Sequence, residues 1–228
     1  MVSDREITVE RAAESDLQRT AFLHVTELPH GLFPKLGQGL VFRWHRAHVR
    51  SGYGIVLVAH DGHNVAGFIV GTTDQRANVS WIIRHHRREL ISAGLLALAV
   101  RPWLALSFLR TRGLRYARRI LRPDLDASSA PDRSLPNRST TGPVAVLEAV
   151  VVDWPERGKG IGTMLVEAFL KQVAAAGVDR VELVTKADAR GAAGFYEHNG
   201  WRRVGGHTDR DGDEVFTYRI NPRLVHAR

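Results

Sequence analysis

The chain has 228 residues, a formal net charge of +8 and no cysteine. Its length fits one domain with an added segment or two small domains. Its composition, 44% hydrophobic and 25% charged, argues against wholesale disorder. The lack of cysteine excludes disulfides, thiolate nucleophiles, zinc fingers and iron–sulfur clusters within this chain. Because residues 1–11 are polar and charged, we expect no signal peptide and a cytoplasmic location.

The first seventy residues predict the order strand, helix, helix, strand, strand. Residues 7–11 alternate as a short strand, and apolar residues recur at helical spacing over about 15–25 and 39–49. Two apolar runs, residues 54–60 and 64–71, flank a turn pair of aspartate and glycine, which is typical of a β-hairpin.

The positive charge is concentrated in the next segment. From Arg76 to Arg122 there are eleven arginines and one acidic residue, Glu89, so this segment carries +10 and the rest of the chain −2. Residues 90–109 are apolar over the length of a membrane span, but an arginine and Pro102 interrupt them, so we predict two short helices meeting there. The polar residues 122–142 predict a loop.

The remaining residues alternate between strand and helix patterns. The apolar run 144–152, interrupted by Glu148, predicts a central strand buried on both faces. The pattern then predicts a helix over 161–173, a strand over 178–185, a helix over 191–199 that ends at Gly200, and strands over 201–205 and 214–220.

A glycine-rich turn joins the strand that ends at 152 to the helix that begins at 161. Its sequence is Arg157-Gly158-Lys159-Gly160-Ile161-Gly162. Alternate glycines let backbone N–H groups converge without side chains in the way, and the helix N-terminus adds partial positive charge. Together they suit a pyrophosphate group, with the arginine and the lysine adding formal charge.

Two better-known phosphate-binding motifs fit this turn less well. The spacing does not match a P-loop. A dinucleotide site needs a different glycine spacing, and although Glu182 lies where a ribose-binding acid should be, it sits inside a strand with fewer than 50 residues after it. A tight strand-to-helix turn without a ligand is the remaining alternative.

Two motifs resemble the GNAT superfamily of N-acetyltransferases. The turn at 157–162, with the preceding Val-Asp-x-x-x-Arg stretch at 152–157, resembles the first signature, Arg/Gln-x-x-Gly-x-Gly/Ala. Residues 192–201, Ala-Ala-Gly-Phe-Tyr-Glu-His-Asn-Gly-Trp, resemble the second signature, Ala-x-x-x-Tyr-Glu-x-x-Gly-Phe. The resemblance implies an α/β fold, a central mixed β-sheet flanked by helices. It divides the chain into the N-terminal part of the domain (1–72), a basic helical insertion with a loop (73–142) and the C-terminal part with the acyl-CoA site (143–228).

The resemblance also implies an activity. It implies an N-acyltransferase that moves an acetyl or other acyl group from acyl-CoA to a primary amine, here a small molecule, by direct transfer in a ternary complex and without a metal. The strand is expected to present backbone N–H groups to the pantetheine arm, and the turn to hold the pyrophosphate. The family often has a CoA-contacting asparagine where this chain has Ala189, and Arg190 is a candidate to replace that contact through a phosphate or the ribose. The residues implied for the cofactor are Val150, Val151, Val152, Arg157, Gly158, Lys159, Gly160, Ile161, Gly162, Thr163 and Arg190.

Two residues are candidates for proton transfer. Tyr196 matches the family's general acid, and a tyrosine can protonate a leaving thiolate; the alternative is a packed aromatic. Glu148 is the only acid in its strand and a candidate general base; the alternative is a glutamate that faces solvent or an arginine of the insertion. His45 and His48 share a helix face but have no third ligand nearby, so we expect no metal site.

The basic insertion has four candidate uses: an acceptor pocket or lid, a homodimer contact, a membrane surface and a nucleic-acid surface. The first two are favoured. Arg43, Trp44 and Tyr53 are candidates for lining the acceptor pocket. The alternative to an enzyme is a non-catalytic acyl-CoA-binding module whose insertion binds a membrane or nucleic acid.

Overall fold

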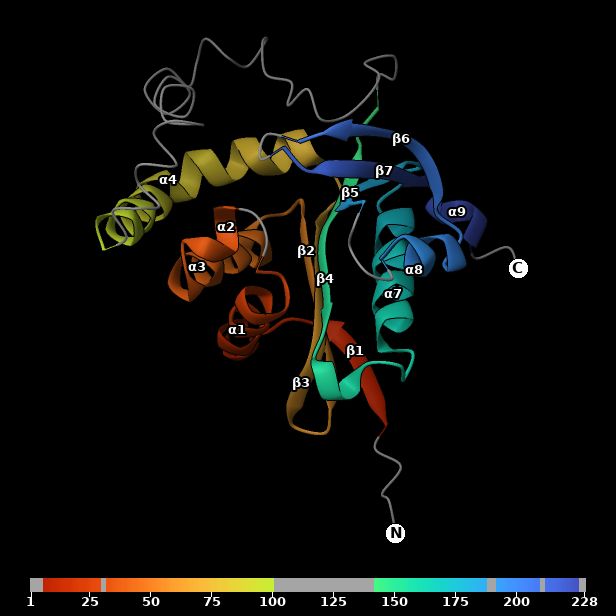
Figure 1. Ribbon diagram of the computed structural model, residues 1–228, viewed down its shortest axis with the longest axis horizontal. Helices are drawn as coiled ribbons and strands as arrows, with labels where there is room; N and C mark the ends of the chain where they lie inside the picture. The colour runs from red at the N-terminus through yellow and green to blue at the C-terminus, as the bar shows by residue number, and fades with distance from the viewer. Residues whose placement is uncertain (1–5, 30–31, 101–141, 188–191, 210–211, 226–228) are drawn as a thin grey trace.

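The computed structural model describes residues 6–29, 32–100, 142–187, 192–209 and 212–225. Their strands form one mixed sheet in the order β1-β2-β3-β4-β5-β7-β6, in which β4 and β5 are parallel and all other neighbours antiparallel (Figure 1). The strands are β1 (Ile7–Arg11), β2 (Gly54–Asp61), β3 (Asn64–Thr72), β4 (Ala145–Val152), β5 (Val181–Lys186), β6 (Arg202–Thr208) and β7 (Glu214–Ile220). The helices are α1 (Leu17–Glu27), α2 (Leu32–Lys35), α3 (Gln38–Arg50), α4 (Gln75–Ala99), α7 (Ile161–Ala175), α8 (Ala192–His198) and α9 (Pro222–Val225), with 3-10 turns at Glu14–Asp16 and Trp154–Glu156.

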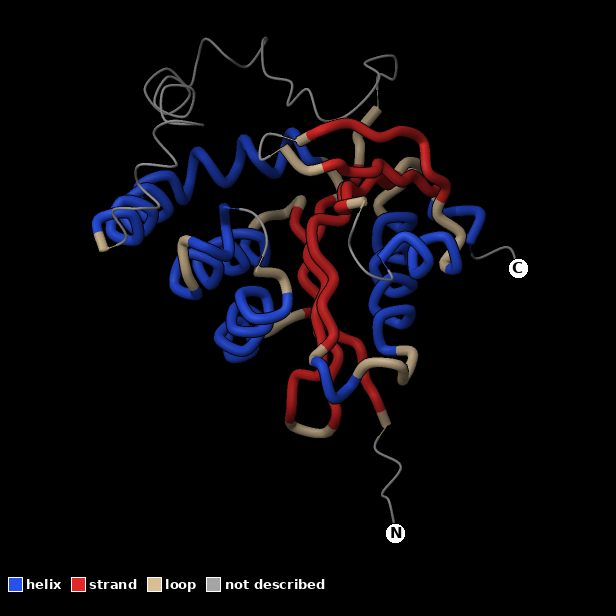
Figure 2. Tube along the Cα trace, in the orientation of Figure 1, coloured by secondary structure: helices blue, strands red, loops and turns tan. Residues whose placement is uncertain are grey.

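Helices cover both faces of the sheet (Figure 2). Helices α1 and α3 pack on one face of β2–β4, and α7 packs on the other. Alternation along β3 sends neighbouring side chains into separate cores, because successive residues of a strand point to opposite faces. Phe68 is buried with Leu17 on the α1 side, and Ile69 is buried with Phe169 on the α7 side.

Strands β4 and β5 pair over a very short stretch. Their register holds at Ala145 with Val181 and at Val146 with Glu182. Beyond this point β4 stays paired with β3 as far as Val152, while β5 continues along β7. Figure 1 shows the two strands diverging. In the described sheet, residues 147–152 of β4 therefore have no strand partner on the side that β5 leaves, and we call this side the β4 edge.

A β-bulge interrupts β4 at Glu148. On β3, Val70 pairs with Ala149 and Gly71 pairs with Leu147, which leaves Glu148 as the extra residue. The bulge reverses the alternation of the strand. Before it, Leu147 is buried on the α7 side, and after it Ala149 is buried on the α1 side. The predicted central strand is confirmed, and both of its faces carry buried residues, although buried and partly exposed residues alternate along it.

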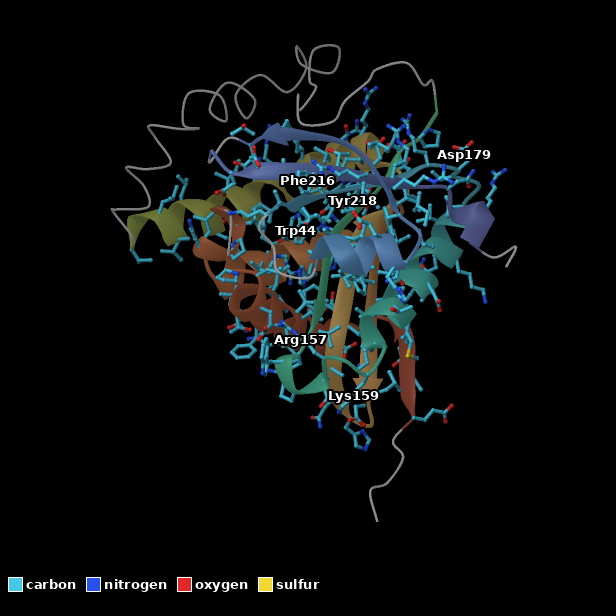
Figure 3. All side chains as sticks on the ribbon, turned by 45° about the vertical axis from the view of Figure 1, so that its right-hand side comes forward. Trp44, Arg157, Lys159, Asp179, Phe216 and Tyr218 are labelled. Carbon is cyan, nitrogen blue, oxygen red and sulfur yellow. The ribbon has the colours of Figure 1, made fainter. Side chains whose placement is uncertain are left out.

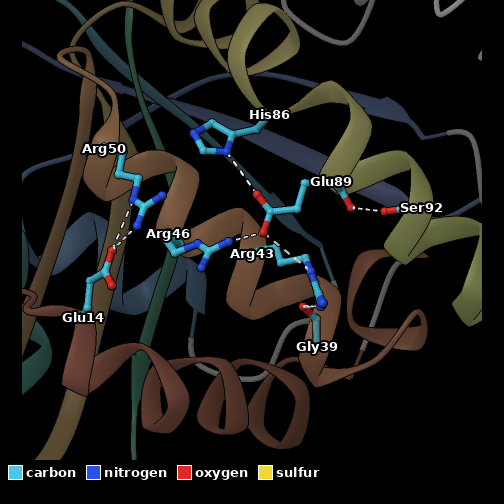
Figure 4. A network of polar contacts seen from close by, with 8 residues as sticks. All are labelled: Glu14, Gly39, Arg43, Arg46, Arg50, His86, Glu89 and Ser92. Atoms are coloured by element: carbon cyan, nitrogen blue, oxygen red, sulfur yellow. Dashed lines mark hydrogen bonds and ion pairs between the residues drawn. The ribbon is translucent and has the colours of Figure 1, made fainter.

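Helix α4 lies beside α3 and begins the segment predicted as a basic insertion. Asp74 caps it by accepting hydrogen bonds from the N–H groups of Arg76 and Ala77. Glu89 forms ion pairs with two arginines of α3, Arg43 and Arg46 (Figure 4). The arginines of α4 itself are exposed to solvent: Arg76, Arg84, Arg87 and Arg88.

Most predicted elements are confirmed, with shifts at their ends. β5 begins at Val181 rather than at 178, although Val178 is buried in the core. β6 continues to Thr208 rather than ending at 205. Helix α2 was not predicted. The predicted second helix after Pro102 and nearly all of the predicted loop at 122–142 lie outside the described residues, and the division of the chain at 72 and 142 stays a prediction. No helix within the described ranges is long and apolar enough to span a membrane.

The contact between α7 and the sheet depends on a glycine. A Cβ atom at Gly71 would lie 2.6 Å from the Phe169 ring and 2.6 Å from the carbonyl oxygen of Val146. A Cβ atom built on Gly94, within α4, would have no atom within 4 Å. The substitution Gly71→Ala should therefore lower the free energy of unfolding by about 1–3 kcal/mol through overpacking. The substitution Gly94→Ala should raise it by up to about 1 kcal/mol, because alanine is the better helix former. Urea denaturation followed by circular dichroism measures both, and equal midpoints for the two variants would contradict this packing.

Candidate active site

The glycine turn has the backbone conformation that its sequence predicts. Gly158 and Gly160 have φ angles of +79° and +80°, a left-handed region that disfavours other residues. Nothing lies within 4 Å of a Cβ atom built on either of them, so the space in front of the turn is open. Ile161 anchors the turn because its side chain is buried in the core. Gly162 allows the start of α7 to approach the Phe195 ring, which a Cβ atom would meet at 3.2 Å.

The turn presents a run of free donors. No backbone N–H from Gly158 to Thr163 donates a hydrogen bond to another group among the described residues. The next one along the chain, that of Met164, bonds to the carbonyl oxygen of Gly160 at 3.1 Å. Unpaired N–H groups at a helix N-terminus attract an anion, and the helix dipole adds to this attraction.

Both basic side chains of the turn already have acidic partners. Arg157 Nη2 lies 2.6 Å from a carboxylate oxygen of Glu27, and the guanidinium also stacks on the Trp154 ring, 4.7 Å from its centroid. Lys159 Nζ lies 2.7 Å from a carboxylate oxygen of Glu156. Figure 3 labels Arg157 and Lys159 near one another at one end of the molecule. A phosphate at this turn would therefore meet the backbone donors first and would compete with carboxylates for the two side chains.

The β4 edge offers backbone groups beside the turn. The Asp153 N–H donates to the carbonyl oxygen of Ala66 at 2.8 Å, and Arg157 Nε donates to the carbonyl oxygen of Val152 at 3.1 Å. In an antiparallel pair, alternate residues direct both backbone groups to the same neighbour. Val151 therefore turns its backbone groups toward β3, whereas Val150 and Val152 turn theirs toward the β4 edge.

Tyr196, on α8, is buried on the α7 side of the sheet with an exposure of 8%. Its ring packs against Phe195, Trp201 and Tyr218, with centroids 5.3–5.9 Å away. Burial raises the pKa of its phenol, so the hydroxyl stays protonated at neutral pH. Among the described residues this hydroxyl has no hydrogen-bond partner. It is thus a packed aromatic whose hydroxyl stays protonated and can donate a hydrogen bond.

Glu148 lies on the other side of the sheet. The bulge turns its side chain toward α3, where Oε2 lies 3.3 Å from Nε2 of His48. The carboxylate does not face bulk solvent, since the side chain is only 14% exposed. Tyr196 belongs to the α7-side core, so the two candidate residues lie on opposite faces of the sheet.

A cluster of buried histidines surrounds this carboxylate. His24, His45 and His48 are all at most 7% exposed, and Nδ1 of His24 lies 3.2 Å from Nε2 of His45. Thr20 Oγ1 lies 2.9 Å from Nδ1 of His45. The helical spacing of His45 and His48 is visible in the sequence, but their neighbours come from α1 and β4 and carry no local signal. No group of three or more His, Asp or Glu side chains in the described part of the chain is arranged to hold a metal ion.

The other predicted site residues are separated. Trp44 packs edge-on against His48, with ring centroids 4.5 Å apart, and so lies near Glu148. Arg43 is directed to Glu89 of α4, and Tyr53 is exposed at the start of β2. Arg190 lies outside the described residues.

Comparisons with known proteins find acetyltransferases. A model of the Acetyltransferase (GNAT) family matches residues 127–201. A chimera of the spermidine N-acetyltransferase SpeG from Vibrio cholerae is 13% identical, with 97% of this chain and 99% of that chain covered and a TM-score of 0.57. Ard1 from Thermoplasma volcanium is 17% identical, with 94% and 97% covered and a TM-score of 0.56. The ribosomal-protein-S18-alanine N-acetyltransferase from Escherichia coli is 12% identical, with 95% and 94% covered and a TM-score of 0.51. No curated protein sequence matches the chain.

The matched segment contains the glycine turn, the β4 edge and Tyr196. The fold is shared with the solved acetyltransferases over nearly the whole of each chain. Residues 127–201 therefore resemble the GNAT family of acetyltransferases, and the chain has the fold of solved acetyltransferases.

Proposed function

We propose that the protein transfers an acetyl group from acetyl-CoA directly to a primary amine while both substrates are bound. The observation that carries this proposal is the run of free N–H donors from Gly158 to Thr163 beside the β4 edge. A pyrophosphate fits the first feature, and a pantetheine arm with its amide groups fits the second. Acetyl-CoA supplies an acyl thioester when bound, and a backbone N–H of Val150 or Val152 is suited to stabilise the oxyanion that forms on its carbonyl.

Tyr196 is proposed as the general acid. The thiol of CoA resembles that of cysteine, with a pKa of about 8.5, so a phenol can donate a proton or a hydrogen bond to the departing sulfur. The raised pKa of Tyr196 keeps its proton in place over the whole working pH range. Its position on the α7 side of the sheet, on the helix that packs against the glycine turn, supports this role.

Glu148 is proposed as the general base. An amine with a pKa of about 10 binds as an ammonium at neutral pH and must lose a proton before it attacks. A carboxylate on the α3 side of the β4 edge can attract this cation and take its proton. The acceptor itself is proposed to be a small-molecule amine. The names of the structural neighbours include acetyltransferases of spermidine and of a protein alanine, so they do not choose between small molecules and proteins.

A screen of amines tests the activity as a whole. Thiol release from acetyl-CoA and from longer acyl-CoAs is measured against a panel of small-molecule amines, and the cysteine-free chain contributes no thiol of its own. Amine-dependent release is the expected result. Tight binding of acetyl-CoA without release on any amine would favour the non-catalytic acyl-CoA-binding module instead.

The glycine turn can be tested with two alanine substitutions at the two ends of α7. Gly160→Ala and Gly177→Ala both force alanine into a left-handed conformation, with φ of +80° and +78°. Each should cost about 1–2 kcal/mol of stability. The first substitution should also raise the Kd of CoA about tenfold or more, because it distorts the donors, whereas the second should leave Kd within about twofold of the wild-type value. Isothermal titration calorimetry measures both, and the same Kd for both variants would remove the turn as the pyrophosphate site.

Replacement of the tyrosine tests the acid. Tyr196→Phe should lower kcat by about 10- to 100-fold and leave the Kd of CoA unchanged, because only the transferable proton is lost. Because burial raises the pKa of Tyr196, its phenol keeps its proton at about pH 10. Ionisation of Tyr196 should therefore not lower the wild-type kcat at that pH, and the wild type and the variant should have pH profiles of the same shape there. Steady-state kinetics at saturating substrates measure the effect. An unchanged kcat would leave Tyr196 with a packing role alone.

Replacement of the glutamate tests the base. Glu148→Gln should lower kcat/KM most at low pH, where the amine is fully protonated, and least near the pKa of the amine, where no base is needed. Glu167→Gln, on the exposed side of α7, is the control and should behave as the wild type. The two pH profiles distinguish the outcomes: a loss that is the same at every pH, or no loss, contradicts the role of base.

A further inference from the structure

The imidazole of His48 lies directly behind Glu148. It is 1% exposed, and its two nitrogens have different partners. Nδ1 lies 3.0 Å from the carbonyl oxygen of Trp44. A carbonyl oxygen can only accept a hydrogen bond, so Nδ1 carries a proton and donates a hydrogen bond to this oxygen. The remaining nitrogen, Nε2, is therefore the one that gains or loses a proton.

Nε2 has one partner for each protonation state. It lies 3.3 Å from Oε2 of Glu148 and 3.0 Å from the Nδ2 amide nitrogen of Asn78. When His48 is neutral, Nε2 accepts a hydrogen bond from Asn78. When His48 is protonated, Nε2–H donates to Glu148. Oδ1 of Asn78 is buried without a partner among the described residues, so rotation of the amide would bring an acceptor to the protonated ring.

We propose that Glu148 and His48 act together as one base, in which His48 stores the proton that Glu148 takes from the substrate ammonium. This inference rests on the proposed function and deepens its base step. The N–H bond of the ammonium breaks, and the proton passes to Glu148 and on to Nε2 of His48. The pair ends as carboxylate and imidazolium, and the amine keeps the electron pair with which it attacks the thioester carbonyl. His48 does not touch the substrate, so it is a positioning and proton-storing residue rather than a catalytic one.

The surroundings of His48 suit this role. His45, on the same helix, has its pKa lowered well below the usual value, by burial first and then by the neighbouring histidines. Burial lowers the pKa of His24, on α1, to about 4. Both are thus neutral at pH 7. Helix α4 contributes Asn78, which carries no charge. Strand β4 contributes the negative charge of Glu148. Burial lowers the pKa of His48, but the charge and hydrogen bond of Glu148 and the Trp44 carbonyl outweigh it and raise the pKa above 6.5.

When the proton is stored on the imidazole ring, Glu148 remains a carboxylate. A lone glutamate has a pKa of about 4.3 and is a poor acceptor for a proton from an alkylammonium. An imidazole with a raised pKa is closer to the working pH, where a general base is most effective. The pair thereby combines the charge that attracts the ammonium with a group that can keep its proton.

The first experiment compares pH profiles of kcat/KM for an amine that stays protonated from about pH 5.5 to 8.5. His48→Gln can still donate a hydrogen bond to Glu148 from an amide but cannot store a proton. It should lower the plateau about tenfold and move the acidic limb down by about one pH unit or more. His60→Gln is the matched control, because His60 of β2 also lies beside two carboxylates, those of Glu10 and Asp16. If the acidic limb is unchanged in His48→Gln, the proposal is overturned. Glutamine preserves a hydrogen-bond donor beside Glu148, so an unchanged profile would mean that His48 acts only as a structural donor.

The second experiment does not need turnover. Nuclear magnetic resonance of the histidine rings follows the protonation of His48 in the wild type and in Glu148→Gln, with His48→Asn used to assign the signal. The expected wild-type ring carries its proton on Nδ1 when neutral and titrates above pH 6.5, and its pKa falls by about one unit or more in Glu148→Gln. A ring that titrates identically in both proteins would overturn the pairing. If the wild type releases no thiol with any amine, the proposed function fails whatever this titration shows. If it transfers acetyl groups and His48→Gln keeps the wild-type profile, the shared base alone fails.

Discussion

The short pairing of β4 with β5 is the constraint on which the site depends. The two strands are hydrogen-bonded neighbours for two register positions, and each then follows its antiparallel partner. Backbone N–H groups of Val150 and Val152 that would otherwise pair with β5 have no strand partner on this side of the described sheet. A sheet in which β4 and β5 stayed paired would leave no strand edge open at this point.

The bulge at Glu148 adds a second condition. Without the extra residue, the alternation set by Val150 and Val152 would direct Glu148 toward the α7-side core, among apolar side chains. Burial of a carboxylate there without a partner would be costly. On the α3 side it meets His48, and that imidazole has its own partners in Trp44 and Asn78. The bulge therefore places the carboxylate beside a buried imidazole that has further polar partners.

The sequence predicts the local parts of this site better than the assembled parts. The glycine turn and the segment around Tyr196 are each contained in about ten consecutive residues, so spacing alone reveals them. The face on which Glu148 lies depends on the β3–β4 register, and a period-two pattern cannot show a one-residue bulge. His48 and Glu148 are far apart in the chain, so the spacing of the histidines along their helix gives no sign of a carboxylate that comes from β4. The partial exposure of β4 was missed for the same reason, since it depends on where β5 leaves.

The carboxylates that pair with Arg157 and Lys159 set how the turn can select its ligand. Both ion pairs lie at the surface, where such pairs contribute about 0–1 kcal/mol, so an incoming phosphate can displace Glu27 or Glu156 at little cost. Until then the two carboxylates cancel the local positive charge, and an anion that reaches only the side chains gains little. The backbone donors from Gly158 to Thr163 have no such competitor among the residues that the structure describes. They favour a group with several oxygens that fits among the converging N–H bonds, so recognition follows the shape of the turn more than its formal charge.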